Sequence, residues 1–568
     1  MRAKYKHELL ILLMGAVLFI PFLGNAHLFD WDEINFAEAA REMIVSHNYL
    51  QVQIDFQPFW EKPPLFFWMQ VLSMKIFGIN EFAARFPNAI CGMLTLLVLF
   101  SIGKKLKDAR FGWLWVICFA GSILPQVYFK SGIIDPWFNF FIFISLYFFI
   151  IYLKHNFSIR FLFYSGLFLG LAVLVKGPAS IAVLILSFFV FFAINRFKLF
   201  LPVKHIFIYA GFVSLTLLPW LLTEIATNGT WFIWEFTKYQ FQLASTGVAG
   251  HSGFFGYHFV VVFFLCFPAT VFAIPSFRKS FDADVDFNNF RKWMLILFWV
   301  VIILFSIIQT KIIHYSSLTY LPITFLAAAT IYHFKNKWNK WINIGQIFSS
   351  FLFLATLILL PYVASHPDLA EHWVKDPVLL KAFTSESSFS GDESLLGIFM
   401  LAGLIVSIVL NNKGKINSAL TVLFSVSVIT INLALIIFLP RIEFYSQQPM
   451  INFFEVHKNE DAYLSVYKFK SYAQLFYGER KESDIENPLF INWLNNQRSK
   501  QNETADWPQP DEYRNLFIWW MLKGDIDKPA LFVVKASAAE KIMKATPQLQ
   551  KIGGEGAYAF LRREPVIK

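Results

Sequence analysis

Long apolar stretches separated by short charged connections fill most of this chain. Thirteen of them approach the roughly 20 residues that a helix needs to cross a bilayer. The predicted spans are Leu9–Leu23, Phe82–Ile102, Trp113–Gln126, Ile134–Leu153, Phe161–Val175, Ala179–Ile194, Ile206–Leu222, Phe259–Ile274, Trp293–Ile308, Tyr315–Tyr332, Ile342–Tyr362, Leu395–Leu410 and Ala419–Leu439. The pattern predicts a polytopic α-helical membrane protein with about 13 transmembrane helices.

Lysine and arginine gather in every second connection, for example at Lys104, Arg196 and Lys337. Because basic residues accumulate on the cytoplasmic side, this alternation predicts a cytoplasmic N-terminus. With an odd number of spans, the tail after Leu439 lies outside. The first apolar segment lacks a good cleavage site and is read as a retained span, not a signal peptide.

Composition excludes a water-soluble protein of this length, since 56% of the 568 residues are hydrophobic, only 15% are charged and the mean hydropathy is +0.51. The net charge of +10 is explained by the basic cytoplasmic loops, so no nucleic-acid partner is expected. All three cysteines, Cys91, Cys118 and Cys266, fall within predicted spans. Neither a disulfide nor a cysteine metal site is expected.

After the last span the composition becomes that of a soluble domain. Alternating apolar residues predict strands near 462–467, 530–534 and 558–561, and helices are expected at 511–523 and 537–545. Ser537 and Glu540 have the spacing of a capping box. The sequence therefore predicts a transmembrane domain over residues 1–440 and a C-terminal periplasmic α/β domain over residues 441–568.

The first outer loop, residues 24–81, carries the acidic run Phe29-Asp30-Trp31-Asp32-Glu33. The segment that follows, to Val45, has one apolar stripe and one charged face, which predicts a helix lying along the membrane interface. A capping role is the alternative for Asp30 and for Asp32, because acidic side chains favour helix N-termini. A carboxylate at Asp32 could otherwise deprotonate a hydroxyl just above the membrane.

The same loop continues with Trp60-Glu61-Lys62-Pro63-Pro64, in which the prolines stiffen the backbone around Lys62. Lys62 could neutralise a phosphate leaving group, or it could only extend its ammonium to the interface. Asp135 and Lys176 lie at predicted membrane ends on the outer side, where charges usually pair or serve a function. A helix cap is the alternative for Asp135, and an interfacial lysine for Lys176.

Two clusters on the outer side contain histidine, one around His251 and His258 and the other at Lys311-Ile312-Ile313-His314-Tyr315. Imidazole together with Glu61 could hold a zinc ion, but no local ligand spacing of the HExxH kind occurs. Plain hydrogen bonding is the alternative for each histidine. The second cluster is better explained as a phosphate contact.

These residues, in this order, resemble the GT-C type glycosyltransferases that use polyprenyl-phosphate sugars, a family that includes the lipid A aminoarabinose transferases and the protein O-mannosyltransferases. The resemblance rests on Asp32-Glu33 with the following Ala-Glu-x-x-Arg-Glu-Met, on Glu61-Lys62-Pro63-Pro64, Asp135-Pro136, Lys176-Gly177, the His251 loop, Lys311-x-x-His314-Tyr315 and the tail segment Tyr467–Ala473. The chain departs from the aminoarabinose transferases where Asn35 replaces an arginine and Phe36 a tyrosine.

The resemblance implies roles for individual residues. Asp32, Asp135 and Glu33 are expected at the catalytic centre, and Lys62, Lys176, Lys311 and Tyr315 at the donor phosphate, while Glu61 with His251 is the pair that can carry zinc. Apart from that zinc ion no cofactor is expected.

The expected function is an inverting transfer of a sugar, aminoarabinose-like or a hexose, from undecaprenyl phosphate in a bacterial inner membrane. Lipid A, another envelope glycan or a protein is the acceptor on the periplasmic side. A protein O-mannosyltransferase-like enzyme is one alternative. A membrane transporter or lipid flippase is another, although the informative charges gather at one face instead of the midplane and no repeated halves are seen.

Overall fold

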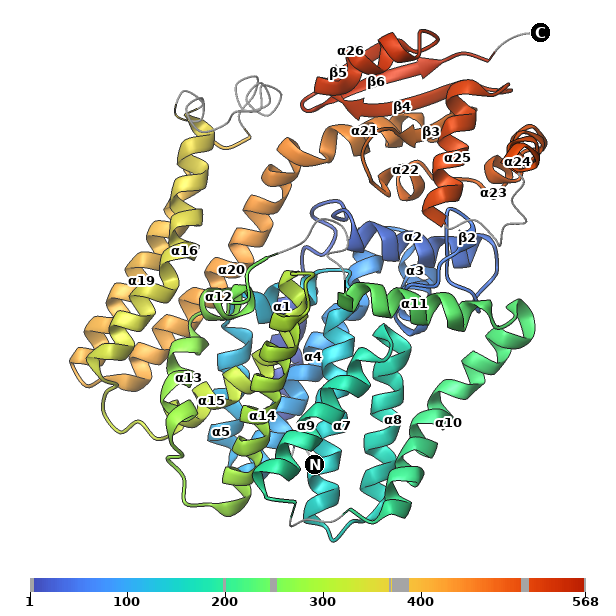
Figure 1. Cartoon of the computed structure of the whole chain (residues 1–568). Helices are drawn as coiled ribbons and strands as arrows, with labels where there is room; N and C mark the ends of the chain where they lie inside the picture. Colours follow the sequence, from blue (N-terminus) through green and yellow to red (C-terminus); the bar gives the residue numbers. More distant parts are fainter. Residues whose placement is uncertain are drawn as a thin grey trace.

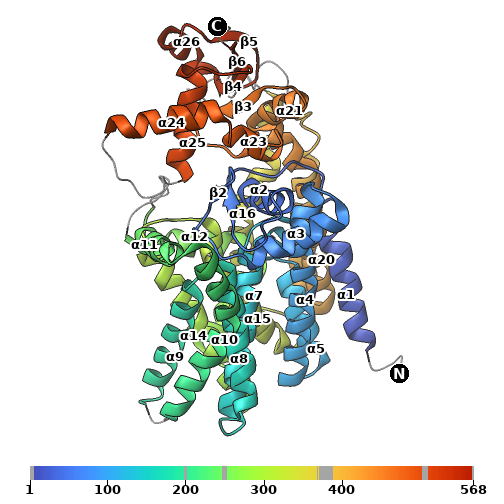
Figure 2. The ribbon, with the colours of Figure 1, turned by 90° about the vertical axis from the view of Figure 1, so that its right-hand side faces the viewer.

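Helices dominate the computed structural model, which describes residues 5–197, 201–245, 253–366, 369, 388–501 and 510–565 (Figures 1 and 2). Among these residues, eight helices are long and apolar enough to cross a membrane. They are α4 (Glu81–Leu106), α7 (Asp135–Lys154), α8 (Ile159–Lys176), α10 (Val203–Asn228), α14 (Val285–Ile307), α16 (Lys340–Ser365), α19 (Ser394–Asn412) and α20 (Ile416–Ser446). Each coincides with one predicted span.

Two other predicted spans are bent pairs of helices, which raise the number of candidate spans to as many as ten. In the first, α5 (Ala109–Ala120) meets α6 (Ile123–Val127) and the 3₁₀ turn η1 (Tyr128–Lys130) at 84°. In the second, α12 (Tyr257–Leu265) meets α13 (Ala269–Arg278) at 117°. Pro268 between α12 and α13 removes a backbone donor at that bend.

The remaining three predicted spans are helices too short to meet the same criterion. They are α1 (Lys6–Phe19), α9 (Ala179–Ile194) and α15 (Tyr320–Tyr332), with 14, 16 and 13 residues. The span predicted from Tyr315 begins as the 3₁₀ helix η3 (Ile313–Thr319), which shortens the α-helix that follows. The described residues thus confirm a polytopic helical protein but not the count of thirteen.

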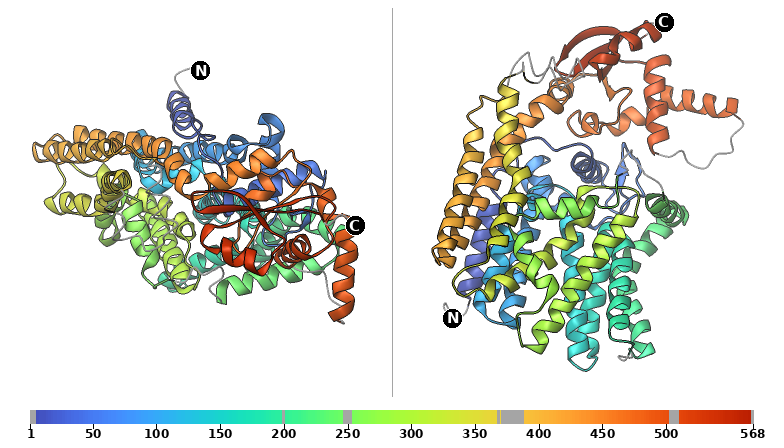
Figure 3. Two further views of the ribbon diagram at one scale, coloured as in Figure 1. Left: turned by 90° about the horizontal axis from the view of Figure 1, so that it is seen from above. Right: turned by 60° about the vertical axis from the view of Figure 1, so that its left-hand side comes forward.

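The first outer loop folds into α2 (Asp32–Val45), the short strands β1 (Gln53–Ile54) and β2 (Gln57–Pro58), and α3 (Leu65–Phe77). The predicted interfacial helix is therefore present as α2, and Phe36 packs its ring against those of Phe66 and Phe67 of α3. Its charged face, however, is buried: the Arg41 guanidinium donates two hydrogen bonds of 2.7 Å to Glu38 and one of 2.9 Å to the carbonyl of Arg480. Figure 3 shows α2, in dark blue, between the helix bundle and the part of the chain that follows α20.

The residues after α20 build a mixed sheet covered by helices. These elements are α21 (Gln448–His457), β3 (Tyr463–Val466), α22 (Ala473–Phe476), α23 (Glu482–Ile485), α24 (Pro488–Gln501), α25 (Pro510–Lys523), β4 (Ala530–Lys535), α26 (Ala536–Ala545), β5 (Gln550–Glu555) and β6 (Tyr558–Arg563). We call this part, residues 448–565, the C-terminal unit. The strand order is β3-β4-β6-β5; β3 and β4 are parallel, with Leu464 opposite Leu531, and the other pairs are antiparallel.

Strand β4 joins two hydrophobic clusters because successive side chains point to opposite faces. Leu531 and Val533 pack with the core that continues into the helix bundle, whereas Phe532 and Val534 pack beneath α24, α25 and α26. The capping box predicted at Ser537 is wrong, since α26 already begins at Ala536 after Lys535. Helix α20 runs to Ser446, past the predicted end of its span, and the domain boundary at 440 stays a prediction.

Candidate active site

A cavity of about 1580 Å³ lies where the first outer loop meets the ends of the helix bundle and the C-terminal unit. It is larger than the roughly 300–1,000 Å³ typical of small-molecule pockets. Of the residues predicted to act, those that line it are Asp32, Glu33, Glu61, Lys62, Asp135, Lys176 and Tyr315. The structure therefore brings together residues that lie up to 283 positions apart in the sequence.

Asp135 is the first residue of α7, and the loop before it is held from two sides. The amide of Asn88 in α4 donates to the carbonyls of Ser131 and Ile133, both at 2.6 Å. The N–H of Gly132 donates to the Glu33 carboxylate at 2.5 Å. These bonds fix the start of α7, so the buried Asp135 carboxylate faces the cavity from a helix N-terminus that favours its negative charge.

Lys176 ends α8 and pairs directly with Asp135, with 2.6 Å between Nζ and Oδ1. Its ammonium also lies 5.0 Å from the ring centre of Tyr315. The next residue, Gly177, has φ +89°, and a Cβ there would come within 2.7 Å of the Phe236 ring. Glycine at this position thus lets the chain turn sharply behind Lys176 and lets α11 (Trp231–Ser245) pack closely.

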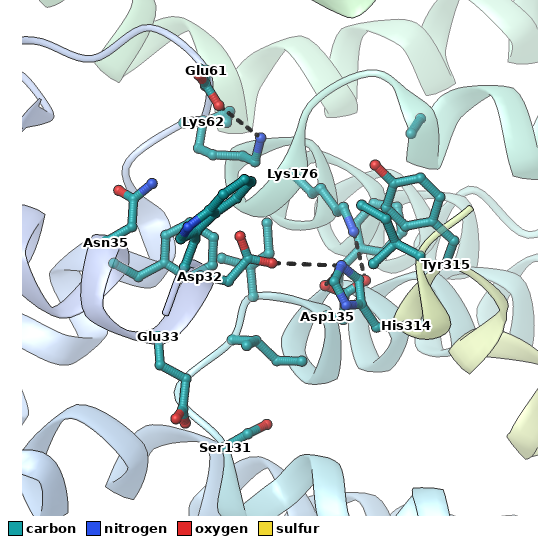
Figure 4. A pocket seen from close by; sticks show the side chains of 18 of the residues that line it. Asp32, Glu33, Asn35, Glu61, Lys62, Ser131, Asp135, Lys176, His314 and Tyr315 are labelled. Carbon is teal, nitrogen blue, oxygen red and sulfur yellow. Dashed lines mark hydrogen bonds and ion pairs between the residues drawn. The ribbon is translucent and has the colours of Figure 1, made fainter. Parts of the chain in front are cut away.

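Asp32 and Asp135 face each other across His314 (Figure 4). Nε2 of His314 lies 3.8 Å from Oδ2 of Asp32 and 3.7 Å from Oδ2 of Asp135. Both distances exceed a normal hydrogen bond, which leaves the imidazole between two carboxylates. Burial lowers the pKa of His314, although Asp135 favours its charged form. Because the ordinary pKa of histidine is about 6.5, the ring is mainly neutral at pH 7.

Lys62 faces the same cavity from the first outer loop. Its Nζ lies 3.9 Å from Glu61 and 5.3 Å from the ring centre of Tyr239 in α11. Glu61 in turn accepts a hydrogen bond of 2.7 Å from the Tyr239 hydroxyl. Burial lowers the pKa of Lys62, while Glu61 and Asp32 oppose this shift. Two of the cations that line the cavity, Lys62 and Lys176, thus lie near Asp32 and Asp135 (Figure 4).

Glu33 also lines the cavity, but its carboxylate is occupied by structural bonds. The Arg85 guanidinium donates to both oxygens at 3.0 and 2.9 Å, and the Phe29 N–H donates at 3.0 Å. Arg85 itself also donates to the carbonyl of Leu23, just before the first outer loop, and to those of Ala26 and His27 within it. The geometry gives Glu33 a role in holding the loop in place, in contrast to the catalytic role expected from the sequence.

Lys311 is not among the residues that line the cavity. Its ammonium donates to the carbonyls of Phe305, Ser306 and Ile308 at 3.1, 2.7 and 2.5 Å. These carbonyls lie at the C-terminal end of α14, where a cation is favoured by the helix dipole. The structure therefore places Lys311 as a helix cap and away from the expected phosphate contact.

No group of three or more His, Cys, Asp or Glu side chains able to hold a metal ion occurs in the described part of the chain. Glu61 is engaged by Tyr239 and Lys62, and His251 lies outside the described residues. Glu61 and its described neighbours therefore do not form a zinc ligand set.

Several cavity residues received no role from the sequence, or a different one. His314 was predicted to contact phosphate together with Lys311 and Tyr315, and its spacing in the chain gave no sign that it would lie between Asp32 and Asp135. Tyr239 and Arg514 lie outside every motif, and the tail segment Tyr467–Ala473, which contains Lys470 and Tyr472, was read only as part of the resemblance, without a site role. These residues reach the cavity through contacts between distant segments, which local patterns do not encode.

Comparisons with known proteins matched one family model and several named relatives. The family model described as dolichyl-phosphate-mannose-protein mannosyltransferase matches residues 61–222. The undecaprenyl phosphate-α-4-amino-4-deoxy-L-arabinose arabinosyl transferase of Enterobacter sp. is 26% identical over 65% of this chain and 68% of its own length. The protein of the same name from Shewanella sediminis is 25% identical over 67% of this chain and 70% of its own length.

Among solved structures, the crystal structure of ArnT from Cupriavidus metallidurans bound to undecaprenyl phosphate superimposes with a TM-score of 0.76, covers 98% of both chains and is 16% identical. This likeness shows a shared fold. The family match and the relatives confirm the resemblance found in the sequence and give no support to a transporter. The chain is a glycosyltransferase that is similar to the GT-C type enzymes using polyprenyl-phosphate sugars.

Proposed function

We propose that this protein moves one sugar from undecaprenyl phosphate to a lipid acceptor at the outer face of a bacterial inner membrane, with inversion at the anomeric carbon. The observation that carries the proposal is the cavity in which Asp32 and Asp135 flank His314 while Lys62 and Lys176 provide positive charge. Such a set serves a reaction in which negative charge grows on a leaving phosphate.

The two parts of the donor, its polyprenyl chain and its phosphate, match two parts of the cavity. One wall is apolar and is built by α8, α9, α10 and α11, with Val173, Ala182, Leu217, Leu221, Phe232 and Phe236. A polyprenyl chain can lie along this wall while its phosphate reaches Lys62 and Lys176. Because Lys176 already pairs with Asp135, the arriving phosphate would share this cation with the carboxylate.

The chemical step breaks the bond between the anomeric carbon and the phosphate oxygen and forms a bond to an acceptor oxygen on the opposite face. The bonding electrons leave with the phosphate, whose charge Lys62 and Lys176 offset. Where the acceptor is a hydroxyl, Asp32 takes its proton, and the carboxylate is 47% exposed toward the cavity for this purpose. Where the acceptor is already a phosphate, no base is needed and Asp32 orients the substrates.

The relatives guide the choice of sugar and acceptor. Because the transferases from Enterobacter and Shewanella are named for undecaprenyl-phosphate aminoarabinose, an aminoarabinose-like sugar and lipid A are the first pair to test. The mannosyltransferase family model supports a hexose and a protein acceptor as the second pair.

Purified enzyme in lipid nanodiscs tests the donor. We expect transfer from an undecaprenyl-phosphate sugar and none from a nucleotide sugar in the absence of polyprenyl lipid. Efficient transfer from the nucleotide sugar alone would overturn the proposal.

Mass spectrometry of lipid A, envelope glycans and periplasmic proteins from a deletion strain and its parent identifies the acceptor. The fraction that loses one sugar mass in the deletion strain is the acceptor. An unchanged profile in all three fractions would contradict a role in envelope modification.

A further inference from the structure

A buried amide in α2 lines the cavity and takes no part in the reaction as proposed above. Asn35 is 7% exposed, and its side-chain oxygen makes no hydrogen bond within the described part of the chain. Its backbone N–H donates to the Trp31 carbonyl at 3.0 Å, which places the residue at the start of the helix. Buried polar atoms in folded proteins nearly always have a partner, so this oxygen requires an explanation.

Helix stability does not explain an asparagine at this position. Asparagine is a weak helix former away from the N-cap, because its side chain competes for backbone hydrogen bonds. The N-cap of α2 is Trp31, four residues earlier. A leucine of similar volume at position 35 would leave no polar atom unpaired. A residue that costs stability at the wall of a cavity is typical of a ligand site.

Asn35 lies one helical turn after Asp32. Residues three apart on a helix share one side, with their Cβ atoms about 5–6 Å apart. Both side chains line the cavity. Figure 4 shows Asn35 on the opposite side of Asp32 from Asp135 and His314, on the side where Lys62 lies. The amide therefore borders the space between the proposed base and one cation of the donor phosphate site.

This space is where the transferred sugar has to lie. In the proposed reaction the donor phosphate reaches Lys62 and the acceptor oxygen approaches Asp32, so the anomeric carbon lies between these two side chains. The rest of the sugar ring extends from that carbon toward the cavity wall to which Asn35 belongs.

The chemistry of a carboxamide suits a pair of neighbouring hydroxyl groups. Whichever way the amide of Asn35 is turned, it presents one acceptor oxygen and one NH₂ donor. Two adjacent hydroxyls of a sugar ring satisfy both, since one donates to the oxygen while the other accepts from the nitrogen. A sugar that lacks one of the hydroxyls leaves a buried polar group unpaired, and sites of this kind reject such analogues strongly.

We propose that Asn35 is a specificity residue that binds two adjacent hydroxyls of the transferred sugar. This inference rests on the proposed function, because it requires the donor phosphate to lie at Lys62. It implies that the donor sugar carries hydroxyls at C2 and C3, the ones nearest the anomeric carbon. An aminoarabinose and a hexose both meet this requirement.

The test measures binding to the full chain in nanodiscs, without acceptor. The ligands are undecaprenyl phosphate, its 4-amino-4-deoxy-L-arabinose and mannose derivatives, and the 2-deoxy and 3-deoxy analogues of both sugar donors. We expect the unmodified protein to bind at least one sugar donor about tenfold more tightly than its deoxy analogue, and Asn35→Leu to lose this preference. The affinity of the variant for undecaprenyl phosphate itself should stay within about twofold.

Gln70→Leu is the matched control. Gln70 of α3 is a buried amide whose side-chain oxygen also lacks a hydrogen bond within the described residues. Its nitrogen donates to the Ala84 carbonyl at 3.0 Å, and the residue does not line the cavity. The Gln70 variant should keep the preference for the hydroxyl-bearing donor. Asn35→Ala decides the case if Asn35→Leu fails to fold, because the smaller side chain adds no bulk to the wall.

Three results would overturn the proposal: deoxy analogues that bind the unmodified protein as tightly as the parent donors, a preference that survives in the Asn35 variants, or an equal loss of affinity for undecaprenyl phosphate and for the sugar donors. The first result is expected if the amide only binds water. Because no acceptor is present and undecaprenyl phosphate is measured separately, a failure here is distinct from a failure of sugar transfer in the donor experiment.

Discussion

Asp32 and Glu33 are neighbours in the sequence, yet the structure places their carboxylates in different surroundings. Asp32 is half-exposed in the cavity, 3.8 Å from His314, whereas Glu33 is buried against Arg85. From the sequence, both acids of the Asp-Glu pair were expected at the catalytic centre. The neighbouring residues do not reveal that Arg85 lies beside Glu33 only. Which carboxylate reacts and which supports the loop can be tested directly.

We predict that Asp32→Asn lowers transfer about 10²–10⁴-fold, the usual contribution of a positioned acid or base. The protein should remain folded, because the side chain is 47% exposed and its removal opens little space. Single-turnover transfer and thermal unfolding, measured on the same preparation, check the loss of activity and the retained fold. Asp461→Asn, at a site 89% exposed, is the control. Near-parental activity would remove Asp32 from the reaction.

Glu33→Gln should act on stability first. It leaves the buried Arg85 guanidinium without its counter-charge, and breaking a buried pair in this way costs about 3–5 kcal/mol. We expect a clear fall in the unfolding temperature, with part of the loss recovered in the double variant Glu33→Gln/Arg85→Met, measured as a double-mutant cycle. A stable but inactive Glu33→Gln protein would instead return Glu33 to the catalytic set.

The contribution of Asp30 to the free energy of unfolding depends on pH. Burial raises its pKa from 3.8 to about 6, and the hydrogen bonds from Ser471 and Tyr472 only partly oppose this. Because the folded-state pKa is the higher one, this contribution is fully present below pH 3.8 and is lost as pH rises through about 6. Asp30→Asn should flatten the fall in thermal stability between pH 4 and 6. An unchanged profile would show that Asp30 does not titrate there.

At the scale of single elements, hydropathy alone predicted where the helices lie in the sequence. It did not predict which of them bend. Eight predicted spans became long helices because their apolar runs are continuous. The bent helix pairs near Ser122 and near Pro268 were each predicted as one straight span, because hydropathy averaged along the sequence does not report a change in helix direction. The charges of α2 were predicted to form one face of an interfacial helix. They are buried instead, because Glu42 and Arg41 bond to the backbone of Asp55 and Arg480, which lie outside the helix.

Lys311 was expected at the donor phosphate, but in the structure it caps α14. A substitution of Lys311 can distinguish these two roles. Its ammonium donates to three carbonyls at the end of α14, so Lys311→Met should lower stability by about 1–2 kcal/mol through the lost cap. Donor affinity should stay within about twofold, because the side chain does not line the cavity. Lys62→Met serves as the contrast, with weaker donor binding. Equal losses of donor affinity in both variants would restore Lys311 to the phosphate site.

For the whole molecule, the sequence placed Asp32, Asp135, Lys62 and Lys176 in one site chiefly through a family resemblance, and all four line one cavity. The part that the C-terminal unit takes in the cavity wall could not be foreseen in the same way. Lys470 and Arg514 reach the cavity because β4 packs against the same core as the helix bundle, an arrangement that depends on contacts between opposite ends of the chain.

Orientation in the membrane is the remaining whole-molecule prediction. Asp282 pairs with Lys107 at 2.9 Å and lies 3.4 Å from Nε2 of His333, so the connections after α4 and α15 share one end of the bundle. Figure 1 shows the C-terminal unit at the other end. The basic residues of these connections predict that their end is cytoplasmic. The C-terminal unit and the cavity would then face the periplasm.

Single cysteines at Lys104 and Lys337 should resist a membrane-impermeant reagent in intact cells, while cysteines at Asp32 and Lys468 should react. Position 471, also predicted to face outward, is a poor probe because Ser471 is only 1% exposed. The native Cys91, Cys118 and Cys266 are buried and give a low background. Labelling at position 104 with protection at position 468 would invert the topology, and a lipid-linked donor on the outer face would then be excluded.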